Sequence, residues 1–276
     1  MMQDRKALQA GTSHFLGQNF AKASNIKFQT DQEGEAFAWT TSWGTSTRLI
    51  GGLIMAHGDD DGVIMPPRIA PSQVVLMPIY RKPEERQAVM DYTDKLAADL
   101  RQMRYAGRRV MVEVDTRDIG GTRNWDWIKK GIPLRVEIGP RDIANDAVFV
   151  GRRDKTPRDK TSMARGAFVE GFTGLLDEIQ ENLFQRAKAF QDDHSRKIDD
   201  RVEFDRFFTP EIAEKPEIHG GFAHAHWCGE DACEERIKND LSVTLRCLPL
   251  DGPEETGKCI CCGKPSNQRA IFAKAY

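Results

Sequence analysis

The spacing of apolar residues divides the chain into segments with different periods. Residues 73–79 form a nearly continuous apolar run, as expected of a buried strand, and residues 84–105 carry apolar side chains at helical spacing. The apolar stripe of that helix consists of Ala88, Tyr92, Leu96 and Leu100. Shorter strand-like segments follow at 110–114, 134–138 and 147–150. This alternation of strand and helix predicts a mixed sheet covered by helices.

The segments on either side of this region have other patterns. Residues 26–29 and 36–39 are predicted to form two strands joined by a polar turn, and the apolar run 49–56 is suited to a buried helix. Residues 163–190 have a helical pattern, whereas the charged segment 192–205 is predicted to be an exposed connection or a surface helix. The apolar face of the long helix consists of Leu175, Leu176, Ile179, Leu183 and Phe184.

Composition limits the classes of protein to which the chain can belong. Its 276 residues allow two or three domains, and its 30% charged and 39% hydrophobic residues are ordinary for a globular protein. The formal net charge of -2 gives no overall attraction to nucleic acid, so any RNA contact must come from a local patch. No apolar run approaches the length of a membrane span, and no signal-peptide pattern begins the chain, which predicts a cytoplasmic protein.

The use of cysteine indicates a metal site, because all six cysteines follow residue 227 in the sequence. Cys228 and Cys233 form one pair, and Cys259 and Cys262 form another. Two such pairs fit a closed, tetrahedral and structural Zn²⁺ site made of thiolates. Cys261 offers a second register for the later pair, so both registers stay open. We favour Cys262, since two intervening residues allow both sulfur atoms to reach one ion.

Three further residues near these pairs are interpreted as structural. Cys247 lies in the apolar segment 242–248, a predicted strand, and is expected to be a buried thiol. His224 and His226 are expected to make hydrogen bonds at the surface rather than to bind zinc.

The stretch 40–51 combines features that suit phosphate binding. It is predicted to be a strand that ends in small residues, followed by an arginine and an apolar helix. Gly44 allows a close approach of backbone to a ligand, and Arg48 can direct a planar, permanently charged group at a phosphate. This arrangement resembles motif 3 of the class II aminoacyl-tRNA synthetases.

Four other stretches, at 8–20, 57–68, 130–142 and 272–276, strengthen this resemblance. In this order they resemble the prolyl-tRNA synthetase family, in the type that carries a C-terminal zinc-binding extension. The resemblance covers essentially the whole chain. It implies that the chain is the C-terminal portion of such an enzyme, without the segments that carry motifs 1 and 2, and that the chain alone is inactive.

The resemblance also implies a fold of three parts, α/β and α+β in class. Residues 1–71 would be the C-terminal part of a class II catalytic domain with its antiparallel sheet. Residues 72–185 would be an α/β anticodon-binding domain with a mixed sheet, and residues 186–276 a small zinc-binding α/β domain.

Candidate residues for the chemistry follow from the same resemblance. ATP, which acts with Mg²⁺, would be bound by Gln9, Thr12, Ser46 and Arg48, and proline by His14 and Trp43. Arg48 would be catalytic, since a fixed cation stabilises charge on the departing pyrophosphate. The consecutive aspartates Asp59–Asp61 are instead predicted to be a solvated loop, because Mg²⁺ is usually held by one or two carboxylates on a rigid frame.

Three residues of the second part, Lys130, Arg135 and Glu137, are predicted to bind tRNA. Guanine presents two acceptors to an arginine and two donors to a carboxylate, and proline anticodons share two adjacent guanines. Arg135 matches the base-reading arginine of the family, whereas the position of the acidic partner is Ile128 here, with Asp126 as a possible substitute. The basic segment 152–160 either follows phosphates or is an ordinary surface loop.

The implied reaction joins proline to its tRNA, with ATP converted to AMP and pyrophosphate. The expected partners are tRNA(Pro), proline and ATP, with a homodimer in the full-length enzyme and no membrane. An alternative function is that of a non-catalytic tRNA-binding module that retains the anticodon-binding and zinc domains. A third possibility is a zinc-stabilised interaction protein without an RNA role.

Overall fold

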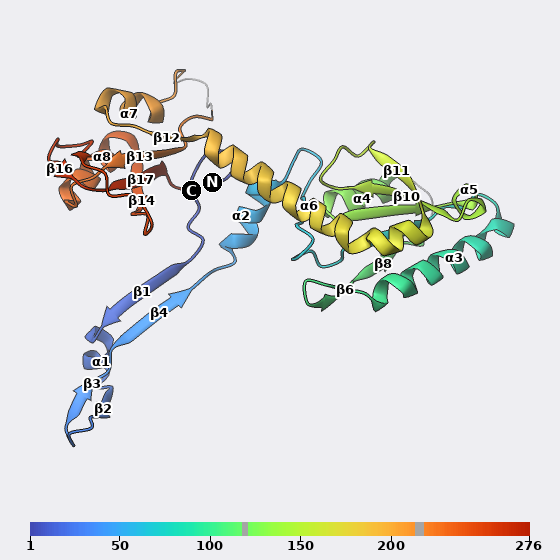
Figure 1. Ribbon diagram of the computed structural model, residues 1–276, viewed down its shortest axis with the longest axis horizontal. Coiled ribbons are helices and arrows are strands. Elements are labelled where there is room, and N and C mark those ends of the chain that lie inside the picture. The colour runs from blue at the N-terminus through green and yellow to red at the C-terminus, as the bar shows by residue number, and fades with distance from the viewer. Residues whose placement is uncertain (118–120, 213–217) are drawn as a thin grey trace. The chain divides into compact units, whose positions relative to one another are not determined.

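The computed structural model of the chain describes residues 1–117, 121–212 and 218–276 (Figure 1). The chain forms two compact units. One unit is the continuous segment Leu53–Asp193, and the other combines Met1–Gly52 with His194–Tyr276. Within the described ranges, no helix is both long enough and apolar enough to cross a lipid bilayer. The three-part division at residues 71 and 185 remains a prediction.

The unit Leu53–Asp193 is built on a five-stranded mixed sheet of order β11-β10-β9-β5-β8. The strands are β5 (Val74–Pro78), β8 (Val112–Val114), β9 (Leu134–Ile138), β10 (Ala147–Arg152) and β11 (Lys160–Ala164). Strand β5 runs parallel to β8 and β9, whereas β10 runs antiparallel to both β9 and β11. The mixed sheet predicted from the alternation of strand and helix is therefore confirmed.

Helices lie on both faces of this sheet, which explains why all five residues of β5 are buried. The helices are α3 (Pro83–Gln102), α4 (Gly121–Lys129), α5 (Pro140–Ala144) and α6 (Arg165–Asp193). Leu96 and Leu100 of α3 join Phe172 and Leu176 of α6 in the main core, as their helical spacing predicts. Trp127 of α4 packs against a smaller core on the other face. Phe184, expected on the apolar face of α6, is instead 55% exposed.

A short hairpin precedes β8 and consists of β6 (Arg104–Tyr105) and β7 (Arg108–Arg109). Its turn places Ala106 and Gly107 at φ angles of 47° and 79°, the positive values that two-residue hairpin turns require. This hairpin was not predicted, because the helical pattern at 84–105 extends into β6.

The C-terminal segment of the other unit folds around a four-stranded sheet of order β12-β13-β17-β14. Its strands are β12 (Ser195–Lys197), β13 (Phe222–His226), β14 (Val243–Cys247) and β17 (Arg269–Lys274). The same segment contains the helices α7 (Arg201–Phe208) and α8 (Asp231–Leu241). It also contains a small antiparallel ribbon of β15 (Gly257–Lys258) and β16 (Pro265–Ser266). Phe204 and Phe208 of α7 pack with Ile237 and Phe272, so the charged segment 192–205 carries part of this core.

Residues 1–52 form an extended antiparallel ribbon rather than a closed core. The ribbon pairs β1 (Thr12–Gly17) with β4 (Thr40–Gly44), and a second hairpin pairs β2 (Lys27–Gln29) with β3 (Glu35–Phe37). Helix α1 (Asn19–Ala23) follows β1, and α2 (Arg48–His57) follows β4. The predicted strands at 26–29 and 36–39 are thus confirmed.

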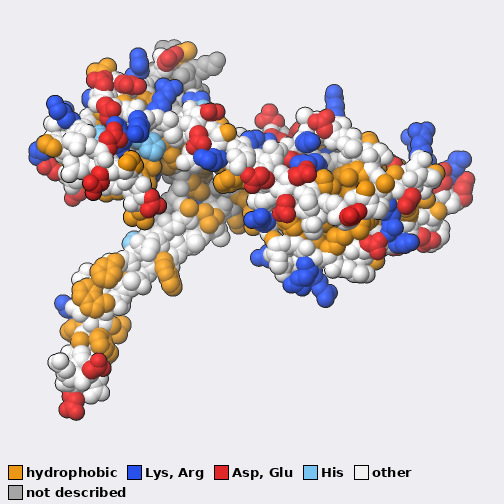
Figure 2. Space-filling view, viewed as in Figure 1, with side chains coloured by type: hydrophobic (Ala, Val, Ile, Leu, Met, Phe, Trp, Pro, Cys, Tyr) orange, Lys and Arg blue, Asp and Glu red, His pale blue; other side chains and the backbone are white. Residues whose placement is uncertain are grey.

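The apolar side chains of this region are largely uncovered. Phe15 and Trp43 are each 72% exposed, and Figure 2 shows hydrophobic side chains along the surface of the ribbon. The helix predicted at 49–56 is present as α2, but the prediction that it is buried is wrong, since no residue of α2 is buried. Its apolar residues have no sheet packed over them among the described residues, so hydrophobicity along the sequence overstated their burial.

Candidate functional site

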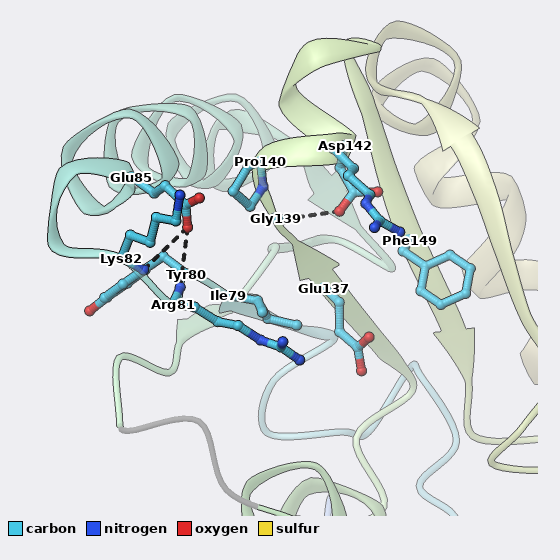
Figure 3. A pocket seen from close by; sticks show the side chains of 11 residues that line it. Ile79, Tyr80, Arg81, Lys82, Glu85, Glu137, Gly139, Pro140, Asp142 and Phe149 are labelled. Carbon is cyan, nitrogen blue, oxygen red and sulfur yellow. Dashed lines mark hydrogen bonds between the residues drawn. The ribbon is translucent and has the colours of Figure 1, made fainter.

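The unit Leu53–Asp193 contains a cavity of about 520 Å³ that is lined by several polar side chains (Figure 3). It opens at the carboxyl ends of β5 and β9, two adjacent parallel strands. The chain leaves β5 toward β8 on one side and leaves β9 toward β10 on the other. The crevice at such a reversal is a usual ligand site in sheets of this kind.

The loops around the cavity are held in place by carboxylates that accept backbone hydrogen bonds. Glu85 Oε2 accepts from the backbone N–H groups of Arg81 and Lys82, at 3.2 and 3.3 Å. Asp142 Oδ2 accepts from the backbone N–H of Gly139, at 2.8 Å. Both contacts are drawn in Figure 3, which also shows the Arg81 side chain extending toward the side of the cavity where the Glu137 carboxylate lies.

Glu137, one of the predicted tRNA-binding residues, lines this cavity beside Phe149 and next to Lys160 of the basic segment 152–160. Glu137 on β9 is directly opposite Phe149 on β10, so both side chains are on the same face of the sheet. Lys160 Nζ lies 2.5 Å from Glu137 Oε1 and 5.7 Å from the centroid of the Phe149 ring. A ring, a carboxylate and an ammonium group are therefore adjacent, which is a suitable set for contacting a nucleobase.

Arg135, predicted to read a guanine, is placed differently. Its side chain is buried, with 1% of the residue exposed, and Nε donates a hydrogen bond to Asn124 Oδ1 at 3.2 Å. Neither terminal guanidinium nitrogen has a hydrogen-bond partner among the described residues. Burial, together with the nearby charge of Arg153, lowers the pKa of Arg135 to about 10, although Glu137 opposes the shift. Direct contact with a base would therefore require this side chain to become uncovered.

The other predicted RNA contacts near α4 do not line the cavity. Lys130 is exposed, and its Nζ lies 4.5 Å from the centroid of the Trp127 ring. Ile128 is fully buried, and Asp126, the possible acidic substitute, already accepts a hydrogen bond from Arg117 Nη1 at 2.8 Å.

The basic segment 152–160 is partly structural. Arg152 is paired with Asp154 and Glu178. Arg153 is buried, and its two terminal nitrogens lie 2.7 and 2.5 Å from the oxygens of Asp59. Neither arginine is positioned to follow phosphates. Asp59 is exposed, as predicted for a solvated loop, but Arg153 also holds its carboxylate in an ion pair, which the sequence did not indicate.

The residues predicted to bind ATP lie in the segment Met1–Gly52, and the structure brings them together. Gln9 Nε2 donates to Thr12 Oγ1 at 2.7 Å, and Arg48 Nη1 donates to Gln9 Oε1 at 3.4 Å. The backbone N–H of Arg48 donates to Ser46 Oγ at 3.3 Å, at the start of α2. All of these contacts are between exposed groups, which leaves the guanidinium accessible to an anion.

The two residues predicted to bind proline are on opposite faces of the β1–β4 ribbon. In the pairing register, His14 is opposite Ser42, whereas Trp43 is opposite Ser13. Since successive residues of a strand point to opposite faces, the ribbon by itself does not bring His14 and Trp43 together.

In the C-terminal segment, the sulfur atoms of Cys228, Cys233, Cys259 and Cys262 all lie within 4.8 Å of one another. Cys228 lies in the connection between β13 and α8, Cys233 lies in the first turn of α8, and the other two lie in the turn between β15 and β16. Backbone N–H groups lower the pKa of Cys259 to about 7 against the opposing effect of burial, so its thiolate forms readily. Four convergent sulfurs fit tetrahedral Zn²⁺, for which thiolate is a preferred ligand.

The remaining cysteines and histidines are placed outside this cluster. Cys261 packs against the hydrophobic core of this segment, which leaves Cys262 as the fourth member of the cluster. The prediction that Cys247 is buried is wrong, since its side chain is exposed on β14. His226 is buried rather than at the surface, and its Nδ1 is within hydrogen-bond distance of Ser266 Oγ, at 3.3 Å.

Two models of known protein families match regions of this chain. The family model of the anticodon-binding domain matches residues 73–175, the segment that contains the mixed sheet and the cavity. The family model of the prolyl-tRNA synthetase C-terminal domain matches residues 211–276, the segment that contains the four cysteines.

Individual relatives extend the likeness to the whole chain. Proline–tRNA ligase 2 of Anaeromyxobacter dehalogenans is 54% identical to this chain, and the alignment covers all of this chain and 55% of the ligase. The proline–tRNA ligase of Bdellovibrio bacteriovorus is 52% identical, and the alignment covers all of this chain and 54% of that ligase. The structure of prolyl-tRNA synthetase from Cryptosporidium parvum, complexed with L-proline and AMP, is 32% identical with a TM-score of 0.84, over 98% of this chain and 54% of that one. The chain thus spans about half the length of the relatives it matches. It belongs to the prolyl-tRNA synthetase family, and corresponds to the C-terminal portion of its members.

Proposed function

We propose that this chain acts in the ligation of proline to tRNA(Pro), in which proline and ATP form prolyl-adenylate and pyrophosphate before the prolyl group passes to the tRNA. The observation that carries this proposal is the identity of about half of all residues to proline–tRNA ligases along the entire chain. The cytoplasm is the expected compartment, and a homodimer is the expected assembly of the full-length enzyme.

Within that reaction, we propose that the cavity at the ends of β5 and β9 reads a guanine of the anticodon. The Watson–Crick edge of guanine presents an acceptor, O6, beside donors at N1 and N2. Lys160 can donate to the acceptor while Glu137 accepts from the donors, because their polar atoms are adjacent. Phe149 offers a ring on which a splayed base can stack. Arg135 lies two residues earlier on the same strand, and its two terminal nitrogens, which have no hydrogen-bond partner among the described residues, would become a further contact once the side chain is uncovered.

For the nucleotide step, we propose that Gln9, Thr12, Ser46 and Arg48 contact ATP and its Mg²⁺, with Arg48 on the terminal phosphates. Their hydrogen-bonded arrangement beside the start of α2 supports this assignment. A fixed guanidinium there would stabilise the charge that develops on pyrophosphate as it leaves. His14 and Trp43 are proposed to contact proline from different faces of the ribbon.

We further propose that Cys228, Cys233, Cys259 and Cys262 hold a structural Zn²⁺. The four sulfurs are the support for this proposal, since Cys₄ sites of this kind are closed and leave no open coordination position for catalysis. Binding would join the start of α8 to the turn between β15 and β16.

The anticodon proposal is tested by measuring the affinity of the chain for tRNA(Pro) and for the same tRNA with the two shared guanines replaced. The wild type should prefer the natural tRNA, and Glu137→Gln should lose about 10–100-fold of that preference, as expected for a lost base contact of 1–3 kcal/mol. Glu170→Gln, an exposed acid on α6 outside the cavity, is the matched control. Equal binding of both tRNAs by the wild type would contradict the proposal.

A further inference from the structure

A second surface of the unit Leu53–Asp193 carries positive charge that no carboxylate of the described residues neutralises. The end of α3 and the β6–β7 hairpin supply four arginines in the nine residues from 101 to 109, namely Arg101, Arg104, Arg108 and Arg109. Lys and Arg side chains gather over this hairpin in Figure 2. None of the four forms an ion pair with any residue that the structure describes; Arg101 and Arg104 donate instead to the carbonyl oxygens of Val112 and Gly107.

The hairpin holds these charges close together and in a fixed position. Arg104 is directly opposite Arg109 in the pairing register, and like charges in such a pair destabilise a hairpin. Tyr105 anchors the hairpin, because its ring is buried and its hydroxyl donates to Asp177 Oδ1 of α6 at 3.1 Å. An anion bound between the arginines would relieve the repulsion without any need to reorganise the turn.

A cavity of about 440 Å³ lies at the same end of the sheet, near the amino ends of β5, β8 and β9. Met65, Pro71 and Ile132 give it apolar walls. Trp127 forms a further wall, with its indole fixed by a 2.6 Å hydrogen bond from Nε1 to Asp115 Oδ2. The space is of the size that encloses a small organic group such as a nucleobase.

Two charged side chains stand at the edges of this cavity. Lys130 Nζ lies over the Trp127 ring and has no acidic partner among the described residues. Glu113 accepts a 2.8 Å hydrogen bond from Ser72 Oγ at Oε1, and its other oxygen forms no hydrogen bond or ion pair within the described part of the chain. A carboxylate at this position repels an acidic side chain and accepts hydrogen bonds from an amino group.

The hairpin and the cavity lie at the same end of the sheet and are linked through the start of β8. The chain passes from β7 into β8, where Met111 exchanges two hydrogen bonds with Gln73, at 2.9 and 3.1 Å. Ser72, the residue before Gln73, lines the cavity. The anticodon cavity described above is at the opposite, carboxyl ends of β5 and β9.

We propose that this surface binds a single-stranded segment of RNA, with backbone phosphates on the hairpin arginines and Lys130 and one amino-bearing base in the cavity. Basic side chains beside an aromatic wall are the usual elements of single-strand recognition. The proposal rests on the proposed function, since it makes this surface a second contact with the same tRNA. An acidic peptide could pair with the arginines, but Glu113 makes the cavity unsuitable for its side chains.

The test is the salt dependence of tRNA(Pro) binding by the full chain and by the triple variant Arg104→Gln, Arg108→Gln and Arg109→Gln. Each phosphate contact contributes about 0.7–0.9 to the slope of log affinity against log salt, so the slope should fall by about 2–3. Glu113→Gln should weaken binding about tenfold at constant slope, as for one lost base contact. The control is a double variant of two exposed lysines, Lys95→Gln and Lys188→Gln, for which no change in slope is expected.

The outcomes separate this proposal from the anticodon proposal. The triple variant should keep the wild-type preference for the natural anticodon guanines, because those guanines contact the other end of the sheet. If the triple variant keeps the wild-type melting temperature and the wild-type slope of log affinity against log salt, the proposal of a second contact is overturned. The proposal of anticodon reading is not affected by that result. Displacement of the tRNA by polyglutamate at a matched concentration of charge would also overturn it, in favour of an acidic protein partner.

Discussion

Replacement of Asp59 by alanine is expected to destabilise the unit Leu53–Asp193 far more than its partly exposed position suggests. Arg153 is buried, with its guanidinium 2.7 and 2.5 Å from the two Asp59 oxygens. Without Asp59 the guanidinium keeps only its hydrogen bonds to the carbonyl oxygens of Ile128 and Gly62. A buried charge left without its partner costs about 3–5 kcal/mol. The Asp59 side chain is 42% exposed, so water can replace part of the pair, and we expect about 2–3 kcal/mol.

The assay is urea and thermal unfolding of the full chain, with hydrogen exchange of β10 amides to identify the unit that opens. Asp59→Ala should lower the melting temperature of this unit by roughly 6–10 °C. Asp60→Ala, an exposed neighbour, should have an effect within about 0.5 kcal/mol. In an Arg153→Met background, Asp59→Ala should cost little more than the control, since the pair is already broken.

The loss of stability caused by Asp59→Ala should also depend on pH, in a direction that follows from the pKa of Asp59. The hydrogen bonds from Arg153 hold the pKa of Asp59 below its ordinary value of 3.8. A carboxyl whose pKa is lowered by folding stabilises the native state above that ordinary value, and this stabilisation is lost as the pH falls through the lower, folded-state value. The difference in the free energy of unfolding between wild type and Asp59→Ala should therefore be largest above about pH 5 and should decrease in stronger acid. Equal losses from Asp59→Ala and Asp60→Ala at neutral pH would refute the reasoning.

Three further predictions concern the other unit. Zinc content per chain should fall in Cys262→Ser and stay at the wild-type value in Cys261→Ser, because the clustered sulfurs include Cys262 and exclude Cys261; the reverse pattern would assign the other register. A chelator should unfold the segment around the cluster while the sheet of Leu53–Asp193 remains folded, since metal binding and folding are coupled. A polypeptide of residues 1–276 should show no proline-dependent pyrophosphate exchange above that of its Arg48→Ala variant, since one phosphate-binding arginine does not replace a complete catalytic constellation. Exchange that depends on Arg48 would contradict this and would exclude the function of a purely tRNA-binding module.

Several features could be predicted from the sequence because their causes are local. The burial of β5, the burial of Leu96 and Leu100 of α3 and the β2–β3 hairpin each follow from the spacing of side chains over one short segment, whereas Ala88 of the predicted stripe is exposed. The two cysteine pairs were recognisable for a similar reason, since ligands that share one ion come from tight turns. Lys160 lies in the basic segment 152–160, and Phe149 lies in the predicted short strand 147–150. Their placement beside Glu137 depends on the register of three strands, which the sequence does not show.

Other features were decided only by tertiary structure, because they depend on partners far away in the sequence. Asp59 resembles a solvated loop residue until Arg153, 94 positions later, occupies its carboxylate. Arg135 and Glu137 have the same spacing in the sequence whether they are open or covered, and only the packing of α4 buries the first of them. The apolar residues of α2 have a hydrophobic pattern that indicates burial, yet burial needs an opposing surface, which the sequence of the helix does not encode. The local pattern of residues therefore determined the elements and the family of this chain, whereas long-range contacts determined which charged groups remain accessible to a ligand.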